Sequence, residues 1–190
     1  MKPRGRFIKM GLISCLLSVL MLVYGCQPTA TVPDQQEPTA VAVVNQTSDP
    51  SQTMGKVGFS QTGEGMLIVA DIQDAPTGEH GFHIHETGSC EDGGKAAGGH
   101  FNPDNVQHGL LVKDGFENAH AGDLGNISVS SNGTTTKTEV IPGLTFNEGK
   151  YAIANLAVII HEKPDDFGQP TGNAGGRIGC GIIEMTESES

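Results

Sequence analysis

The chain has 190 residues, enough for one domain with a sizeable hydrophobic core. Its 11 basic and 22 acidic residues give a net charge of −11, which argues against nucleic acid and anionic lipid surfaces as partners. With 27 glycines, 10 prolines and no stretch of sustained helical periodicity, the composition favours short strands and tight turns over helices.

Residues 1–25 have the pattern of a secretory signal. The segment opens with four basic residues, Lys2, Arg4, Arg6 and Lys9. The apolar run GLISCLLSVLMLVYG follows and is too short to span a bilayer comfortably. Removal of this segment takes away four positive charges and no negative ones, so 7 basic and 22 acidic residues remain, a net charge of −15. We therefore expect an exported, strongly acidic mature protein.

The end of this segment suggests how the mature chain is held. The sequence VYGC resembles a bacterial lipobox, in which the cysteine, here Cys26, becomes the lipidated N-terminus. Tyr24 is unusual in that motif, so secretion after ordinary cleavage is the alternative. Residues 26–38 are polar and contain proline, and we interpret them as a lipid anchor and flexible tether. We expect a location on the outer face of the cell membrane, or a periplasmic or secreted one, with the anchor as the only membrane contact.

The predicted export signal also indicates which of the four cysteines remain in the mature domain. Cys15 leaves with the signal and Cys26 is the predicted anchor, so Cys90 and Cys180 remain in the mature chain. In an oxidising compartment, two remaining cysteines predict one disulfide. The alternative is a pair of free buried thiols.

Short runs with strand character then follow in chain order. They lie at residues 40–45, 55–61, 66–72, 126–131, 134–141, 151–161 and 177–184. Asn132 and Gly133 separate two of these runs and predict a hairpin. We predict an all-β domain over residues 39–185, a sandwich or flattened barrel with long glycine-rich loops, followed by an acidic tail at 186–190.

Four of the seven histidines fall between residues 80 and 100. In GFHIH, strand alternation puts His83 and His85 on one face, and Phe82 and Ile84 on the other. Two imidazoles about 7 Å apart along a strand can converge on one ion. In LAVIIH the same alternation separates His161 from its apolar neighbours. We expect the apolar side chains to face the core and the histidines to face outward beneath the loops.

The residue types around these histidines favour copper and zinc. Imidazole suits both metals. A carboxylate three residues after a histidine, as with His120 and Asp123, suits a zinc ion with nitrogen and oxygen ligands. Both mature cysteines are committed to the predicted disulfide, so no thiolate remains for a soft metal.

Six segments together resemble the copper/zinc superoxide dismutases. They are GFHIH, GGHFNP, HG, HAGDLGN, VIIHEKPDD and GNAGGRIGCG, and they occur in the family's order. The similarity covers roughly residues 40–185. The cysteine five residues after His85 resembles the bacterial branch of the family. The resemblance implies a Greek-key β-sandwich, or flattened eight-stranded barrel, with two long active-site loops.

The resemblance also implies roles for individual residues. It assigns copper to His83, His85, His100 and His161. It assigns zinc to His100, His108, His120 and Asp123, so that His100 is shared as a bridging imidazolate. It places Arg177 beside the copper, Asp165 as the carboxylate that links a copper histidine to a zinc histidine, and a disulfide between Cys90 and Cys180. His80 is left outside the ligand set, and we predict that it lies at the surface.

The implied activity is dismutation of superoxide to dioxygen and hydrogen peroxide, with His100 and Arg177 as catalytic residues. Lys163 is the only basic residue between His161 and Arg177, so we expect anion steering to rely heavily on Arg177. A homodimer is possible in this family, but the sequence does not identify its surface. The alternative function is a catalytically silent protein on the same fold that binds or buffers copper and zinc.

Overall fold

The computed structural model describes residues 39–186; the predicted signal, Cys26, the tether and tail residues 187–190 lie outside this range. Within it the strands are β1 (Ala40–Gln46), β2 (Thr53–Gln61), β3 (Met66–Ile72), β4 (Gly78–His85), β5 (Asp123–Val129), β6 (Thr135–Ile141), β7 (Ala157–His161), β8 (Arg177–Ile182) and β9 (Glu184–Met185). The helical segments are η1 (Lys95–Ala97), a 3-10 turn, and α1 (Leu111–Asp114). None of the helices described is long and apolar enough to cross a membrane.

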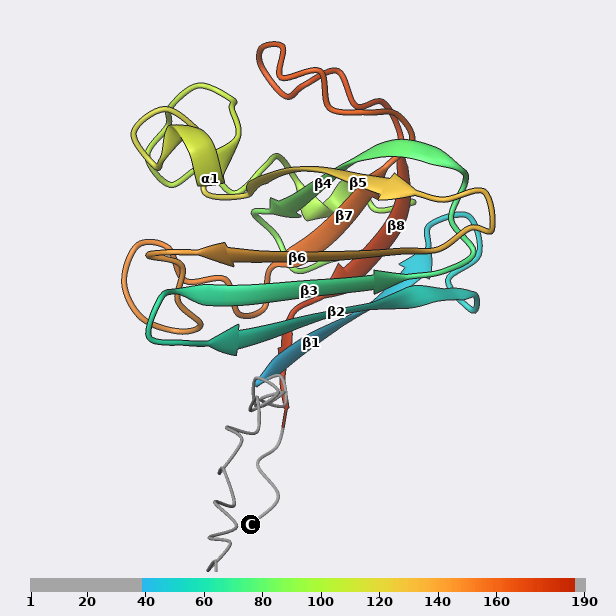
Figure 1. Ribbon diagram of the computed structural model, residues 1–190, viewed down its shortest axis with the longest axis horizontal. Helices are drawn as coiled ribbons and strands as arrows, with labels where there is room; N and C mark the ends of the chain where they lie inside the picture. Colours follow the sequence, from blue (N-terminus) through green and yellow to red (C-terminus); the bar gives the residue numbers. More distant parts are fainter. Residues whose placement is uncertain (1–38, 187–190) are drawn as a thin grey trace, which may run out of the picture. The chain divides into compact units, whose positions relative to one another are not determined.

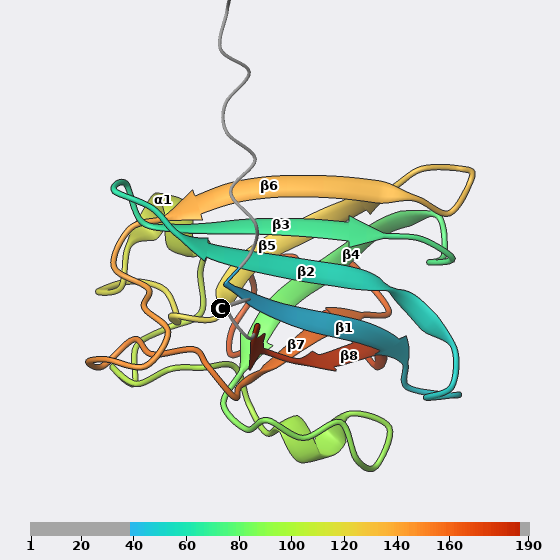
Figure 2. The same cartoon turned by 90° about the horizontal axis from the view of Figure 1, so that it is seen from below.

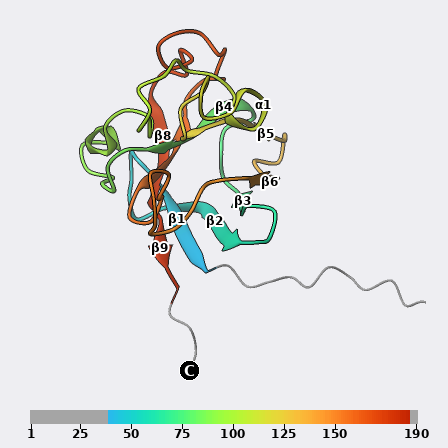
Figure 3. The ribbon, with the colours of Figure 1, turned by 90° about the vertical axis from the view of Figure 1, so that its left-hand side faces the viewer.

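The strands form a nearly closed antiparallel barrel, which confirms the all-β prediction. Their order in the sheet is β5-β4-β7-β8-β1-β2-β3-β6, and β9 extends the pairing along β1. Figure 2 shows β6, β3, β2 and β1 side by side in this order. Figure 3 shows β4 and β5 on the side of the barrel opposite β1 and β2. In Figure 1 the loop between β7 and β8 and the segment that contains α1 extend beyond the barrel on the side of β4 and β7.

The predicted hairpin across Asn132 and Gly133 is wrong as a strand pair. The turn forms, and Ser130 N–H donates to Thr134 O over 3.0 Å. However, β5 pairs with β4, and β6 pairs with β3, so the two strands are the edges of the sheet. The side chain of Lys137 on β6 reaches across this seam, and its Nζ donates to Leu124 O on β5 over 3.0 Å. The turn residues correctly indicated a reversal of the chain but not which strand each run pairs with.

The predicted strand at 151–161 is shortened in the structure to β7. Asn155 adopts a φ of +62°, which interrupts extended backbone. Its N–H donates to Ile183 O over 2.9 Å, and Leu156 N–H donates to Ile153 O over 3.2 Å. Residues before Ala157 therefore form a turn that delivers the chain to the middle of the sheet.

Strand alternation separates two apolar clusters. Phe82 and Ile84 of β4, with Val158 and Ile160 of β7, belong to the core inside the barrel. On the outer face, Ala157, Ile159 and Cys180 pack with Ala97 from the loop after β4. His83, His85 and His161 share this outer face by alternation. The histidines are therefore outside the barrel but buried beneath a loop, as the sequence pattern predicted.

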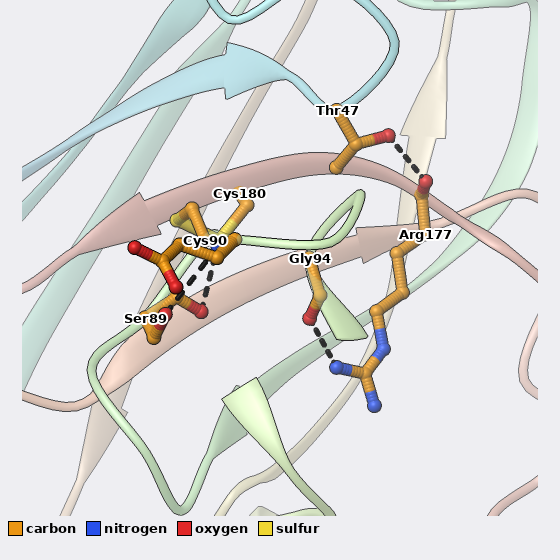
Figure 4. The surroundings of a disulfide bond; sticks show 7 residues. Thr47, Ser89, Cys90, Gly94, Arg177 and Cys180 are labelled. Atoms are coloured by element: carbon orange, nitrogen blue, oxygen red, sulfur yellow. Dashed lines mark hydrogen bonds between the residues drawn. A yellow bond between two sulfur atoms is a disulfide. The ribbon is translucent and has the colours of Figure 1, made fainter. Parts of the chain in front are cut away.

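The disulfide holds that loop to the barrel. Cys90 in the loop after β4 is bonded to Cys180 on β8, with 90 residues of sequence separation (Figure 4). Gly94 N–H donates to Cys90 O over 3.1 Å, and Gly98 N–H donates to Lys95 O over 3.2 Å, so the loop is compact. The predicted pairing of the two mature cysteines is present in the structure.

Replacing both cysteines, as Cys90→Ser with Cys180→Ser, is expected to lower the free energy of unfolding by about 4–5 kcal/mol. The reason is that the bond closes a loop of roughly 90 residues in the unfolded chain. Urea denaturation of the metal-free protein measures the change. A double variant as stable as the unaltered protein would show that the closed loop adds nothing.

Candidate metal centre

Strand β4 presents two histidines on one face. His83 pairs with Ile159 and His85 pairs with Ala157 on β7, so both imidazoles project from the outer surface of the barrel. His85 also forms an isolated bridge with His100, which brings the end of the long loop back onto β4. His161 is the last residue of β7 and pairs with Arg177 at the start of β8. Four elements of sequence thus meet at one end of the strand pair β4 and β7.

A first group of four histidines results from this arrangement. Each of its members offers a ligand atom within 4.8 Å of the others, and all four are buried: His83, His85, His100 and His161. His85 Nε2 and His161 Nε2 lie 3.3 Å apart. His85 Nδ1 donates to Gly98 O over 3.0 Å, which leaves Nε2 as its unprotonated nitrogen. The group offers only imidazole nitrogen.

A second group adds a carboxylate and shares His100 with the first. It consists of His100, His108, His120 and Asp123, again buried and within 4.8 Å. Asp123 Oδ1 lies 2.8 Å from His100 Nδ1 and 3.1 Å from His120 Nδ1. Asp123 Oδ2 lies 2.9 Å from His108 Nδ1. Because His100 Nδ1 faces the second group, Nε2 is the ring nitrogen left for the first.

Asp165 joins the two groups from behind. Its Oδ2 lies 2.8 Å from His83 Nε2, and its Oδ1 lies 2.9 Å from His108 Nε2. Gly172 packs so closely on this carboxylate that a Cβ at that position would lie 1.8 Å from Asp165 Oδ1. Such a carboxylate fixes the tautomer and ring orientation of both histidines.

Asn126 is a support for Asp165 that the sequence analysis missed. Asp165 N–H donates to Asn126 Oδ1 over 2.7 Å, and Asn126 Nδ2 donates to Asp165 O over 2.9 Å. The amide therefore holds the backbone of Asp165 at two points. Its position three residues after Asp123 offered no signal of this contact across 39 residues of sequence.

His80 was predicted at the surface, and this prediction is wrong. Its side chain is buried, with 3% of the residue exposed. His80 Nδ1 lies 2.8 Å from His161 O, and His80 Nε2 lies 2.8 Å from Pro76 O. The ring therefore connects the loop before β4 to the end of β7. The sequence analysis placed His80 at the surface because it had no role in the ligand set. In the structure its ring instead contacts the backbone carbonyl of His161, a member of that set.

Two orphaned nitrogens test whether the site fits copper and zinc. His83 Nδ1 and His108 Nδ1 are buried and have no hydrogen-bond partner. His108 Nδ1 does lie near Asp123 Oδ2, but this approach lacks hydrogen-bond geometry. A buried polar atom without a partner is costly, and a coordinated cation removes that cost. One orphaned nitrogen belongs to each group, so the residues present fit two metal ions.

Burial keeps three histidines of the first group neutral, which is the form that binds metal. Burial, then the nearby His100, lowers the pKa of His85 to about 2. Burial, then His83 and His100, lowers that of His161 to about 3. Burial also lowers the pKa of His100 to about 4, although its hydrogen bond with Asp123 opposes the change.

In the second group, the carboxylates of Asp123 and Asp165 oppose the effect of burial on the pKa of His108. Burial lowers the pKa of His108, but its contacts with Asp123 and Asp165 outweigh burial and raise the pKa to about 9. Burial raises the pKa of Asp123, but His100, His108 and His120 hold it well below the usual range. Asp165 is also held below its usual pKa by His108 and His83 against the effect of burial. Both carboxylates are therefore ionised at neutral pH.

Arg177 lies at a cavity that opens onto the first group. The cavity has a volume of about 180 Å³, and its lining includes His85, His100, His161 and Arg177. Among the described residues that line it, Arg177 is the only permanently charged one. Burial lowers the pKa of Arg177, but a guanidinium remains charged at neutral pH. The cavity thus offers one fixed positive charge to a small anion.

Three contacts hold Arg177 in place, and Figure 4 shows those with Gly94 and Thr47. Its Nη1 donates to Gly94 O, and its Nη2 donates to Gly98 O over 2.5 Å. Its own carbonyl accepts a hydrogen bond from Thr47 Oγ1 over 2.6 Å. The loop that carries Cys90 therefore also orients the guanidinium.

The chain matches a known family over this whole region. Residues 53–183 match the model described as copper/zinc superoxide dismutase (SODC). The chain belongs to the copper/zinc superoxide dismutase family. Copper and zinc are the metals of this family, in agreement with the two histidine groups.

Named relatives and a solved structure agree with this membership. The chain is 39% identical over 145 residues to the extracellular superoxide dismutase [Cu-Zn] of Caenorhabditis elegans, covering 73% of this chain and 64% of that protein. It is 40% identical over 145 residues to that of Drosophila melanogaster, covering 72% and 78%. A crystal structure of a double mutant of a SOD-like protein from Bacillus subtilis has a TM-score of 0.68 and 33% identity, covering 76% and 96%. The match thus spans less than two thirds of the nematode protein.

Metal-free protein is expected to lose stability as the pH falls from about 6.5 toward 3. Unfolded histidine titrates near 6.5, whereas folded His85 and His161 titrate near 2 and 3. The unfolded chain therefore binds more protons in this window, and each such histidine lowers the free energy of unfolding by up to about 1.4 kcal/mol per pH unit.

Urea denaturation at pH 7, 6, 5 and 4 measures this slope, and the double variant His85→Gln with His161→Gln should have a shallower one. His108 opposes the trend only above about pH 6, because its raised pKa adds stability that is fully present below the unfolded pKa of about 6.5 and is lost toward pH 9. A free energy of unfolding that stays constant down to pH 4 would contradict the burial of neutral histidines.

Proposed function

We propose that the protein catalyses the dismutation of superoxide to dioxygen and hydrogen peroxide at a copper centre joined to zinc by His100. One observation carries this proposal. A single buried histidine belongs to both ligand groups, with its Nδ1 2.8 Å from the carboxylate of the second group. A structural module or a simple metal store has no need for one ring shared between two different ligand sets.

The chemistry of each donor set supports the choice of metal. The first group, His83, His85, His100 and His161, has four nitrogen donors and suits copper. The second, His100, His108, His120 and Asp123, has three nitrogens and one carboxylate and suits a tetrahedral zinc site. Asp165 holds one histidine of each set, so the two ligand groups are linked through this carboxylate as well as through His100.

When bound, copper supplies the one-electron redox change, and zinc supplies a fixed positive charge without redox chemistry. The overall reaction consumes two superoxide anions and two protons and yields one dioxygen and one hydrogen peroxide. Arg177 binds and orients the anion in the cavity. His100 holds a proton at Nε2 during half of the cycle and gives it up in the other half. His85 and His161 stay neutral throughout, because burial disfavours their charged forms.

The setting we propose is an exported protein that protects the cell surface or envelope from external superoxide. The two animal relatives are named extracellular, and the predicted signal and Cys26 lipidation are consistent with export. The spacing of Cys90 after His85 favours the bacterial branch of the family. We propose residues 39–185 as the functional domain, tethered through residues 26–38, with no nucleic-acid partner and with a homodimer as the assembly to test.

The competing function is a catalytically silent protein that buffers copper and zinc. Arg177 favours the enzyme, because a metal store does not need a positive charge fixed at the cavity that opens onto its copper ligands.

Metal analysis with a superoxide-consumption assay separates the two functions. The purified domain is expected to bind one copper and one zinc and to consume superoxide far faster than the uncatalysed reaction. His100→Ala should lose most of this activity while the barrel stays folded, as circular dichroism can show. One copper and one zinc bound without turnover would favour the buffer and overturn the enzyme.

Arg177→Ala is expected to reduce the rate at low ionic strength by about 10-fold or more, and to flatten its dependence on salt. The reason is that a net charge of −15 on the mature chain repels the substrate, and Arg177 is the fixed charge of the cavity. Lys56→Ala, which removes an exposed positive charge from β2, serves as the control. Equal rates and equal salt dependence in the Arg177 variant would show that steering comes from elsewhere.

A further inference from the structure

One peptide unit lies at the junction of the copper ligands and the anion site. The carbonyl of Gly98 accepts a hydrogen bond from His85 Nδ1 over 3.0 Å and another from Arg177 Nη2 over 2.5 Å. A predicted copper ligand and the substrate arginine therefore share one acceptor. A change in the direction of this carbonyl would affect both at once.

This peptide unit has little stiffness of its own. It joins Gly98 to Gly99, and Gly98 has a φ of +76° and a ψ of −150°. Because glycine populates many backbone conformations, a plane between two glycines can rotate with little steric penalty. The peptide itself is planar and trans, so the N–H of Gly99 points away from the carbonyl of Gly98. Whatever holds that N–H also sets the direction of the carbonyl.

The side chain of Glu86 provides this hold. Gly99 N–H donates to Glu86 Oε1 over 2.9 Å, and Glu86 N–H donates to Gly99 O over 2.9 Å. Glu86 directly follows His85, at the end of β4. A Cβ at Gly98 would lie 2.7 Å from Glu86 Oε1, so the carboxylate also packs against this glycine. The peptide is thus held at its N–H edge by a carboxylate and at its opposite, carbonyl edge by an imidazole and a guanidinium.

We propose that Glu86 is a positioning residue that locks the Gly98–Gly99 peptide, and so orients both His85 and Arg177. The inference rests on the proposed function for its catalytic consequence, but the lock itself is a property of the fold. Glu86 acts through the hydrogen bond of its Oε1 rather than through its charge. A carboxamide at this position keeps the acceptor and loses the charge, whereas alanine loses both.

The test compares Glu86→Ala with Glu86→Gln, and uses Glu64→Ala in the β2–β3 turn as a control that also removes one exposed carboxylate. Amide hydrogen exchange of Gly99 by NMR, in the zinc-loaded or reduced metal-loaded protein, reads the lock directly. The Cu(II) electron paramagnetic resonance spectrum reads the orientation of His85. The dependence of superoxide turnover on ionic strength reports whether Arg177 still attracts and orients the anion.

We expect Glu86→Ala to accelerate exchange at Gly99 at least about 10-fold, to change the copper hyperfine pattern and to lower turnover several-fold. Glu86→Gln should keep the copper spectrum of the unaltered protein and stay within about twofold of it in Gly99 exchange and turnover. The control variant Glu64→Ala should match the unaltered protein in all three measurements. Should Glu86→Ala fail to fold, Glu86→Met gives a second route, because it keeps a side chain of similar length and removes the acceptor at Oε1. We expect that variant to show the same exchange and spectral changes.

Two results would overturn the proposal. Unchanged Gly99 exchange in Glu86→Ala would mean that the peptide is held without the carboxylate. Equal losses in Glu86→Gln and Glu86→Ala, with a matching change in salt dependence, would mean that Glu86 acts by charge. Amide exchange at Gly99 is measured without turnover. It therefore still tests the role of Glu86 if the protein proves not to be an enzyme.

Discussion

The shared position of one buried imidazole, that of His100, is the constraint on which the site depends. Its Nδ1 faces Asp123, while the ring itself is packed 4.1 Å, centroid to centroid, from His83 in the other group. A ring that belongs to two ligand groups must be fixed in orientation as well as in position. The bridge between His85 and His100, the loop that carries Gly98 and Gly99, and the carboxylate of Asp123 all serve that purpose.

The barrel supplies the stiffness that this ring needs. Strands β4, β7 and β8 each have a paired strand on both sides, and none of them is an edge strand of the seam between β5 and β6. Their inner faces are locked in the apolar core, so their outer faces hold His83, His85 and His161 at fixed spacing. The disulfide fastens the covering loop to β8, and Asp165, itself held by Asn126, ties the two groups together from behind. Several small constraints therefore converge on one cluster of buried polar groups, where a loose fit would be costly.

The sequence predicted what is periodic or local. Alternation in GFHIH and LAVIIH was enough to place three histidines outside the core. The predicted export signal left Cys90 and Cys180 as the expected disulfide partners, and the structure pairs them. The sequence could not predict what depends on long-range pairing. The turn at Asn132 and Gly133 indicated a hairpin, yet its strands pair with β4 and β3, because side-chain burial and not turn chemistry chooses the partner. His80 and Asn126 were missed because their partners, His161 and Asp165, are distant in the chain.

Exchange coupling between two metals tests the account most directly. With cobalt(II) in the zinc position and Cu(II) in the other, an imidazolate of His100 between them should couple the two spins and strongly diminish the Cu(II) paramagnetic resonance signal. Protonating the His100 imidazolate with acid, or replacing His100 by glutamine, should restore an isolated copper signal. A full-intensity Cu(II) spectrum at neutral pH, with both sites loaded in equal amounts, would show that no ring joins the metals and would contradict the account.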